Sequence, residues 1–148
     1  RNGWYTENWT GTLGAALAAG ALIGAAGAAQ FTPATRRDYA EAIAIVAADA
    51  AHAGATYELG GDEAFTLADL AAEVARQTGK PLPYNDLPPE VYQGILESLG
   101  LPAGFAAMLV DVDVKAAEGW LAHSSGTLSG LLGRPTATMA SAVAAALG

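Results

Sequence analysis

Cysteine is absent from this sequence and basic residues are scarce, and each shortage argues against a class of protein. Without cysteine the chain has neither disulfides nor thiolate metal sites, which fits a cytoplasmic location. Lysine and arginine together number 7 against 15 acidic residues, for a net charge of −8. Arg36-Arg37 is the only adjacent basic pair. Because nucleic-acid binding depends on clustered cations that neutralise phosphates, the sequence argues against that function.

The side-chain patterns of a metal centre or a catalytic triad are also lacking. The two histidines form no pair, so we expect no metal site. His123 precedes two serines, but sequence neighbours rarely have triad geometry, and serine is common at helix caps. Asp111 and Asp113 lie two residues apart, so on a helix their carboxylates diverge. The residues alone therefore predict no catalytic group.

A glycine-rich phosphate loop is missing as well. The segment most similar to such a loop is Thr10-Gly11-Thr12-Leu13-Gly14. Its two glycines have the wrong spacing, and no predicted strand precedes it. We interpret this segment as a place of helix packing. The chain is thus expected to have no cradle of its own for the phosphates of a cofactor.

One uncharged run, from Asn8 to Thr35, suggests a membrane span and contains the GxxxG spacing Gly20 to Gly24. The run is mostly alanine and glycine, however, and its glycines would weaken one long helix by about 1 kcal/mol each relative to alanine. Pro33 also lies near its end. We therefore expect a buried helix, a turn and a short buried strand, and no membrane span.

Apolar periodicity and capping residues predict a helix-rich α/β protein. Thr35 to Asp38 and Thr66 to Asp69 resemble capping boxes with Asp in place of the usual Glu. Between them, Asp62-Glu63 is expected to form a solvated turn. In the helix after Thr35 we expect one apolar stripe, made of Ala40, Ile43, Ala44, Ala47 and Ala48. We expect helices at 4–19, 36–53, 67–78, 90–99, 102–120, 128–132 and 138–147.

Short strands are predicted at 22–24, 31–34, 56–59 and 82–85, so strands and helices alternate up to about residue 85. These strands are too few and too short to form an independent sheet with two covered faces. They would need partner strands from elsewhere.

The first eight residues, Arg1-Asn2-Gly3-Trp4-Tyr5-Thr6-Glu7-Asn8, are unlike an ordinary terminus, which is loose and polar. An amide such as that of Asn2 can anchor a carboxamide or a carbonyl, and flat aromatic rings can cover a flat ligand. On a helical path Trp4 and Asn8 would share a face. From chemistry alone, the plainer explanation is favoured, in which Trp4 and Tyr5 are core residues and the asparagines are caps.

Ordered matches downstream change this balance. The octapeptide is followed by Gly20-Ala-Leu-Ile-Gly-Ala-Ala-Gly27, Ala34-Thr-Arg-Arg-Asp-Tyr-Ala40, Thr56-Tyr-Glu-Leu-Gly-Gly-Asp-Glu-Ala-Phe-Thr66, Gly79-Lys-Pro81 and Thr127-Leu-Ser-Gly-Leu-Leu-Gly-Arg-Pro-Thr136. In this order they resemble the C-terminal half of NmrA-like atypical short-chain dehydrogenases. The resemblance is greatest to type 2 NAD(P)H:quinone oxidoreductases, with triphenylmethane reductase as a relative, and it covers essentially the whole chain.

The resemblance implies late Rossmann elements at residues 1–65, with a helix, short strands, a helix and a strand. Residues 66–148 would form a mainly helical substrate lobe, and the N-terminal Rossmann half with the dinucleotide fingerprint would be absent from this chain. By this likeness Asn2 lies where the chain passes the nicotinamide, and Trp4, Tyr5 and Asn8 line the cleft where a quinone ring stacks. The helix after Thr35 and the strand 56–59 would pack on the missing sheet.

The implied reaction is hydride transfer from NADP(H) or NAD(H) to a quinone-like acceptor, with the cofactor bound mainly by the missing N-terminal half. This chain would be inactive alone. The alternatives are a non-catalytic NmrA-like dinucleotide sensor, an epimerase-like sugar-nucleotide enzyme and a small membrane protein. The segment from Leu101 to Val110 is too apolar to favour the sugar-nucleotide enzyme. The resemblance leaves room for a homodimer.

Overall fold

The computed structural model describes residues 1–148 and divides into two compact units. Unit 1 comprises Arg1–Thr12, Phe31–Phe65 and Leu121–Gly148, and unit 2 comprises Leu13–Gln30 and Thr66–Trp120. The last 28 residues thus join the N-terminal segment in unit 1. The expected boundary between a Rossmann part at 1–65 and a substrate lobe at 66–148 is a division by role, and it stays a prediction.

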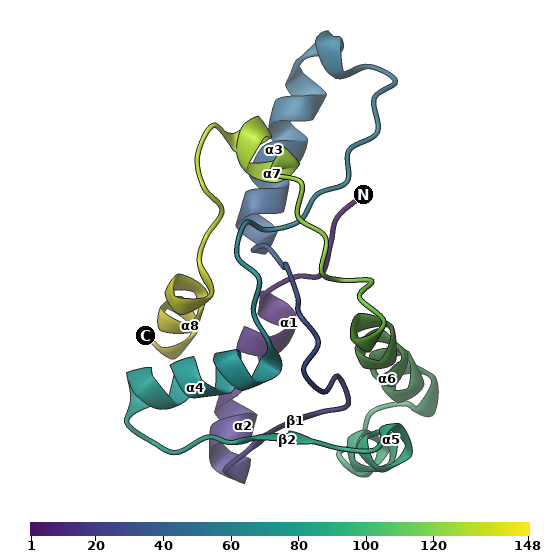
Figure 1. The fold of residues 1–148 in the computed structure, drawn as a ribbon, viewed down its shortest axis with the longest axis vertical. Coiled ribbons are helices and arrows are strands. Elements are labelled where there is room, and N and C mark those ends of the chain that lie inside the picture. Colours follow the sequence, from purple (N-terminus) through teal and green to yellow (C-terminus); the bar gives the residue numbers. More distant parts are fainter. The chain divides into compact units, whose positions relative to one another are not determined.

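Unit 1 is built from helices and from extended segments that pair only at single residues. Its helices are α1 (Glu7–Thr10), α3 (Arg36–Ala48), the 3-10 helix η1 (Ala50–His52), α7 (Thr127–Leu132) and α8 (Met139–Leu147). α3 lies beside α7, and α1 contacts α8 (Figure 1). Isolated β-bridges join Asn2 to Leu59, Tyr5 to Ala34 and Phe31 to Phe65. The strand predicted at 56–59 is therefore present as a single bridge at Leu59.

The single helix predicted from Trp4 to Ala19 is wrong. Trp4 and Tyr5 are extended, because the backbone there bridges to Ala34, and α1 begins only at Glu7. The helix is then interrupted at Gly11, and α2 (Leu13–Ala19) begins two residues later. Gly11 weakens a continuous helix. The pairing of Tyr5 with the distant Ala34 therefore prevails over the local helical propensity. Trp4 and Asn8 consequently do not share a helical face.

The apolar stripe predicted on α3 is exposed within this chain, since Ile43 is 55% exposed and the four predicted alanines are exposed. The buried face carries Asp38, Tyr39 and Ala42 instead. Apolar residues occur all around this alanine-rich helix, so their spacing does not select a face. The largest side chain selects it: Tyr39 packs in the unit 1 core, with Ala34, Ala42, Leu59 and Leu128.

The capping box predicted at the start of α3 is half formed. The Thr35 hydroxyl accepts a hydrogen bond from the Asp38 N–H at 3.2 Å, but the Asp38 carboxylate does not return to the Thr35 N–H. It accepts from Ala137 N–H at 3.0 Å and from Arg134 Nη1 at 2.9 Å. Burial alone would raise the pKa of Asp38, but these hydrogen bonds, with that of Thr35, outweigh it and lower the pKa. Asp38 therefore ties α3 to the C-terminal segment as a carboxylate.

The turn predicted to be solvated at Asp62-Glu63 is a second attachment of the C-terminal segment. The Asp62 carboxylate accepts from the Thr136 N–H at 2.9 Å and from the Ser129 hydroxyl at 2.7 Å. Glu63 accepts from the N–H of Met139, the first residue of α8, at 2.7 Å. A carboxylate at a helix N-terminus is stabilised by the orphan N–H groups there.

Extended segments cross closely at Gly60 and Gly61. The Gly61 N–H donates to Thr32 O at 2.8 Å, and the Thr32 hydroxyl donates to His123 O at 2.8 Å. A Cβ on Gly60 would lie 2.3 Å from His123 O, and one on Gly61 would lie 2.0 Å from Pro33 O. Only a residue without a side chain fits either place.

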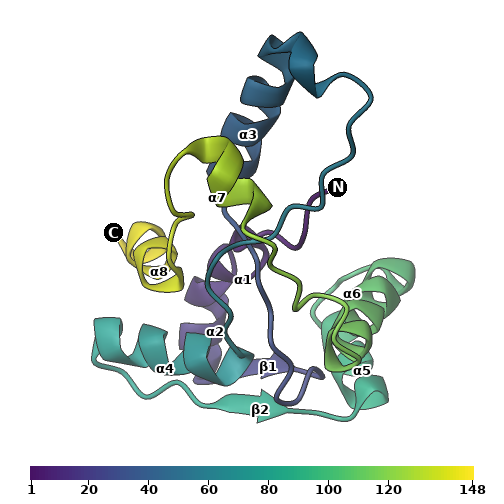
Figure 2. The same ribbon diagram turned by 45° about the horizontal axis from the view of Figure 1, so that its top comes forward.

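Unit 2 contains a two-stranded parallel sheet of β1 (Leu22–Gly24) and β2 (Tyr84–Asp86), in which Leu22 pairs with Tyr84. α2 and α4 (Leu67–Thr78) pack against β1, as does α5 (Pro89–Ser98) (Figure 2). The strand predicted at 22–24 is confirmed, and that predicted at 82–85 begins two residues later.

The helices of unit 2 follow the sequence closely. α4 has the complete Thr66–Asp69 capping box, buries Leu67, Leu70, Ala71 and Val74, and ends at the left-handed Gly79. α5 begins at Pro89, and α6 (Ala103–Ala117) begins directly after Pro102. α5 and α6 bury Leu96, Ala106 and Val110 between them. No helix combines the length and the apolar character needed to cross a membrane.

Replacing Gly61 with alanine is expected to destabilise the chain by about 1–3 kcal/mol, because the new Cβ would overlap the Pro33 carbonyl oxygen. The matched control is Gly130→Ala in α7, where an added Cβ meets nothing within 4 Å. Alanine should stabilise that helix position by up to about 1 kcal/mol. Thermal unfolding of the three proteins measures both effects. Equal melting temperatures for the parent and Gly61→Ala would contradict the crossing.

Candidate functional site

Asn2 has a fixed backbone and an exposed side chain. Its neighbours pair with Leu59 on both sides: the Gly3 N–H donates to Leu59 O at 2.8 Å, and the Leu59 N–H donates to Arg1 O at 2.9 Å. The Asn2 amide nitrogen donates to the Tyr5 hydroxyl at 3.3 Å. The amide oxygen makes no hydrogen bond within the chain, so it is available to a ligand.

Tyr5 is half-buried and held on three sides. Its backbone is bridged to Ala34, and its ring meets Tyr39 edge to face with centroids 5.4 Å apart. The Arg36 guanidinium lies 5.8 Å from the ring centroid. Such contacts fix the direction of a ring without covering it completely. The structure thus brings Asn2 and Tyr5 together.

Trp4 and Asn8 are held by other neighbours. Trp4 lies 6.5 Å from Trp9, ring centroid to ring centroid. Trp9 in turn meets Phe31 at 4.9 Å and Phe65 at 5.9 Å. The half-buried Asn8 uses its backbone N–H to bond Tyr5 O at 3.0 Å, while its side-chain amide makes no hydrogen bond within the chain.

Trp9, which the sequence did not indicate as a site residue, is the residue that anchors Trp4. Trp9 follows Trp4 by five residues, and this spacing predicts no contact between them where the chain passes from an extended segment into a helix. Only the two phenylalanines, distant in sequence, explain its importance.

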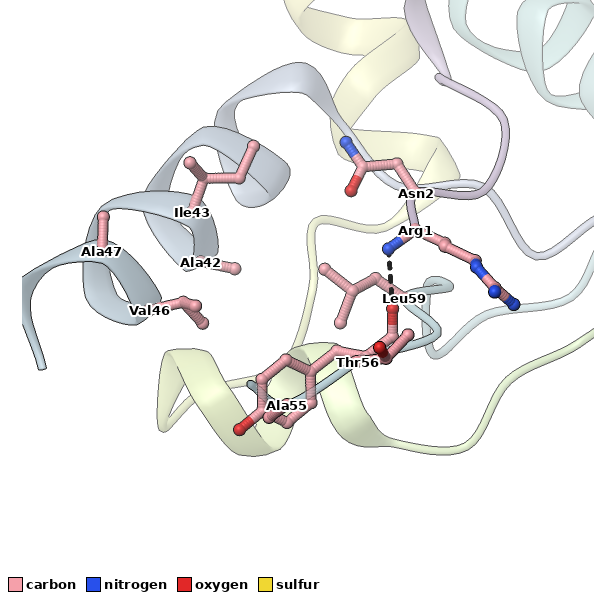
Figure 3. Close-up of a pocket in the computed structure, with 10 residues that line it drawn as sticks. Arg1, Asn2, Ala42, Ile43, Val46, Ala47, Ala55, Thr56 and Leu59 are labelled. Carbon is pink, nitrogen blue, oxygen red and sulfur yellow. Dashed lines mark hydrogen bonds between the residues drawn. The ribbon is translucent and has the colours of Figure 1, made fainter. Parts of the chain in front are cut away.

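An open groove of about 360 Å³ lies between α3, the segment 55–59 and the N-terminal residues (Figure 3). Its lining is largely aliphatic, and Asn2 stands at its edge. The Tyr57 hydroxyl lies 2.7 Å from Nδ1 of His52, the last residue of η1. The groove offers no pair of acid and base groups, so its chemistry is that of a packing surface. It is lined by Arg1, Asn2, Ala42, Ile43, Val46, Ala47, Ala55, Thr56, Tyr57 and Leu59.

Three consecutive N–H groups in unit 2 point at side chains of the same unit. Ala25 donates to Asp113 at 2.8 Å, Ala26 to the Tyr84 hydroxyl at 3.2 Å, and Gly27 to Asp86 at 2.8 Å. Every donor of this turn is therefore occupied, and the turn offers no place for an anion.

Asp113 is the buried carboxylate of this cluster. Burial raises its pKa, the Ala25 N–H lowers it, and the nearby Asp86 raises it, with a net rise above 3.8. As predicted, Asp111 and Asp113 diverge, since Asp111 is exposed and Asp113 is buried.

The remaining polar candidates have structural contacts. The Ser125 hydroxyl lies 2.6 Å from that of Thr127, at the start of α7, and His123 contributes its backbone carbonyl to Thr32. No group of three or more His, Cys, Asp or Glu side chains could hold a metal ion.

Comparison with solved structures identifies the fold as that of the C-terminal half of NADPH-dependent reductases. No protein-family model matches the chain. An NADPH-dependent quinone oxidoreductase from Escherichia coli superposes over the whole chain with a TM-score of 0.97 and 48% identity. The structure of this enzyme complexed with NADPH gives the same values. Triphenylmethane reductase from Citrobacter sp. covers 99% of the chain with a TM-score of 0.92 and 26% identity.

Among curated proteins, quinone oxidoreductase 2 of E. coli strain K12 is 50% identical over 143 residues, which is 97% of this chain. The chain spans about half the length of this relative, and 54% and 51% of the two solved enzymes. The resemblance and the helix-rich α/β fold inferred from the sequence are thereby confirmed.

Replacing Asp113 with asparagine should keep an acceptor for the Ala25 N–H and remove a buried charge. Because the folded pKa of Asp113 lies above its unfolded value near 3.8, the folded state holds the proton more tightly. Asp113 therefore costs stability progressively as the pH rises from 3.8 through the raised pKa.

We expect Asp113→Asn to be at least as stable as the parent at pH 7. The decrease in stability that the parent shows as Asp113 loses its proton should be absent from this variant. The control is Asp111→Asn on the same helix, where an exposed change should stay within about 0.5 kcal/mol. Urea unfolding between pH 4 and 8 measures both. A clear loss of stability in Asp113→Asn at pH 7 would show that the ionised carboxylate is a net stabiliser.

Proposed function

We propose that this chain forms the C-terminal half of an NAD(P)H-dependent oxidoreductase that transfers hydride to a quinone-like acceptor. The observation that carries the proposal is the match of 97% of the chain, at 50% identity, to an enzyme named as a quinone oxidoreductase. A further support is that a solved structure of such an enzyme is complexed with NADPH. No observation favours a non-catalytic sensor, since the two solved relatives described above are named as an oxidoreductase and a reductase.

In this proposal NADP(H), or NAD(H), is bound mainly by an N-terminal half, and Asn2 contacts its nicotinamide. The Asn2 amide suits a carboxamide, because the nitrogen is held by Tyr5 and the oxygen is left as an acceptor for an N–H donor. The backbone pairing with Leu59 keeps this amide in one position. The cofactor supplies the hydride, while Asn2 orients the ring that carries it.

Trp4, Tyr5 and Asn8 are proposed to contact the acceptor. Both aromatic rings are half-buried and rest on a second ring, Trp9 or Tyr39, so each keeps one part exposed on a rigid support. A flat quinone gains from contact with such rings. Its carbonyl oxygens need hydrogen-bond donors, which the Asn8 amide and the Tyr5 hydroxyl provide.

The groove in Figure 3 is proposed to be covered by the N-terminal half. The groove has exposed aliphatic residues, including Ile43. They belong to the apolar stripe predicted on α3 or lie beside this stripe. Covering them would remove apolar surface from water at about 25 cal/mol per Å². A substrate lobe at 66–148, a homodimer and a cytoplasmic location remain predictions.

The proposal is tested by joining the chain to the N-terminal half of E. coli quinone oxidoreductase 2, in frame before Arg1. This joined enzyme should oxidise NADPH when a benzoquinone is added, whereas the 148-residue chain alone should not. The absorbance of NADPH follows both reactions. Turnover by the chain alone would contradict the role given to the N-terminal half, and a folded but inactive joined enzyme would contradict the function.

Asn2→Ala in the joined enzyme should weaken NADPH binding about tenfold, as expected for a hydrogen bond of about 1.4 kcal/mol. Titration of NADPH fluorescence measures the dissociation constant directly. Asn85→Ala, at an exposed position of β2, is the matched control and should leave it unchanged. If both variants bind NADPH as the parent does, Asn2 does not contact the nicotinamide.

A further inference from the structure

We propose that Tyr5 donates the proton that completes reduction of the acceptor, an inference that rests on the proposed function. Reduction of a quinone to a hydroquinone requires a hydride and a proton. The hydride comes from NAD(P)H, so the protein has to supply or conduct the proton. Among the residues proposed to contact the acceptor, Tyr5 is the one with an acidic hydroxyl.

The hydrogen-bond pattern of two neighbouring tyrosines assigns this role to Tyr5. The hydroxyl of Tyr39 is buried and donates its proton to Leu59 O at 3.3 Å. Burial raises the pKa of Tyr39 to about 12. The Tyr5 hydroxyl, in contrast, accepts from the Asn2 amide and donates to no atom of the chain. Its proton is therefore free for a ligand.

The surroundings of Tyr5 fit a donor that must hold one direction. The Asn2 amide occupies one lone pair of the hydroxyl oxygen, which limits rotation of the O–H bond. The edge-to-face contact with Tyr39 and the bridge to Ala34 fix the ring and the backbone. General acids need this kind of placement within hydrogen-bond reach of the reacting atom.

Charge near the ring favours the product of proton donation. The Arg36 guanidinium lies 5.8 Å from the Tyr5 ring centroid and makes no ion pair within the chain. The nearby Glu7 carboxylate is engaged with the backbone N–H of Arg36, at 3.0 Å from both oxygens. The guanidinium charge thus remains available to stabilise the tyrosinate formed when the proton leaves.

The hydride of NAD(P)H forms a bond to one carbonyl oxygen of the acceptor, which becomes the hydroquinone monoanion, and NAD(P)H becomes NAD(P)⁺. The O–H bond of Tyr5 breaks and a new O–H bond forms on the other carbonyl oxygen, which gives the hydroquinone. The tyrosinate then takes a proton from water.

The test compares Tyr5→Phe with Tyr39→Phe in the joined enzyme, using two quinones that differ in their need for a proton. Duroquinone is electron-rich, and its reduced anion is strongly basic. A dichloro-substituted benzoquinone is electron-poor, and its anion forms without help. Loss of a general acid should lower kcat for duroquinone about 100-fold and for the dichloro compound much less.

Tyr5→Phe should leave the melting temperature nearly unchanged, since the only hydrogen bond of the hydroxyl within the chain is with the exposed Asn2 amide. Because this bond holds Asn2, NADPH binding should weaken by no more than the loss of about tenfold expected of Asn2→Ala. Duroquinone binding, followed by quenching of tryptophan fluorescence, should weaken. Tyr39→Phe should lower the melting temperature instead, with similar small effects on kcat for both quinones. Leu59 O would still accept from the Gly3 N–H in that variant.

An equal loss of kcat with both quinones, or no loss with either, would overturn the role of Tyr5. These results require a parent joined enzyme that reduces both quinones. If that parent reduces neither, the proposed function itself fails, so the two failures are distinguishable.

Discussion

The close crossing of extended segments at Gly60 and Gly61 is the constraint on which unit 1 depends. A side chain at either position would run into a backbone carbonyl, at 2.3 Å from His123 O or 2.0 Å from Pro33 O. The crossing lets Thr32 bond both Gly61 and His123. It therefore holds three stretches of chain together without a regular sheet, at the cost of two positions that admit only glycine.

The candidate site residues are held in place by segments that take part in this crossing or lie next to it. Residue 59, next to the crossing, pairs with Asn2, and residue 34 pairs with Tyr5. Each pairing is a single bridge, so the site residues are held by tertiary contacts rather than by a strand or a helix. The C-terminal segment adds to this hold through hydrogen bonds to the carboxylates of Asp38 and Asp62, and these bonds lower the pKa of both residues.

Local signals in the sequence predicted the helices of unit 2 well and the path of the first eight residues poorly. The α4 helix was predictable because its capping box, its apolar stripe and its terminal Gly79 agree with one another. The path of the first eight residues was predicted wrongly, because the positions of Trp4 and Tyr5 suit a helix. Tyr5 pairs instead with Ala34, which is 29 residues away in the sequence. On α3 the residues buried within this chain are not those of the apolar stripe, since the position of Tyr39 is set by residues from three other segments.

Signals along the chain were enough to predict the helix-rich α/β class, the caps, the family resemblance and the candidate residues Asn2, Trp4, Tyr5 and Asn8. These follow from short-range chemistry and from ordered motifs. Tertiary contacts were needed to show that Asn2 bonds Tyr5, that Tyr39 donates its hydroxyl proton within the chain whereas Tyr5 does not, and that Trp9 supports Trp4. Such relations depend on segments far apart in sequence, whose meeting no local pattern encodes.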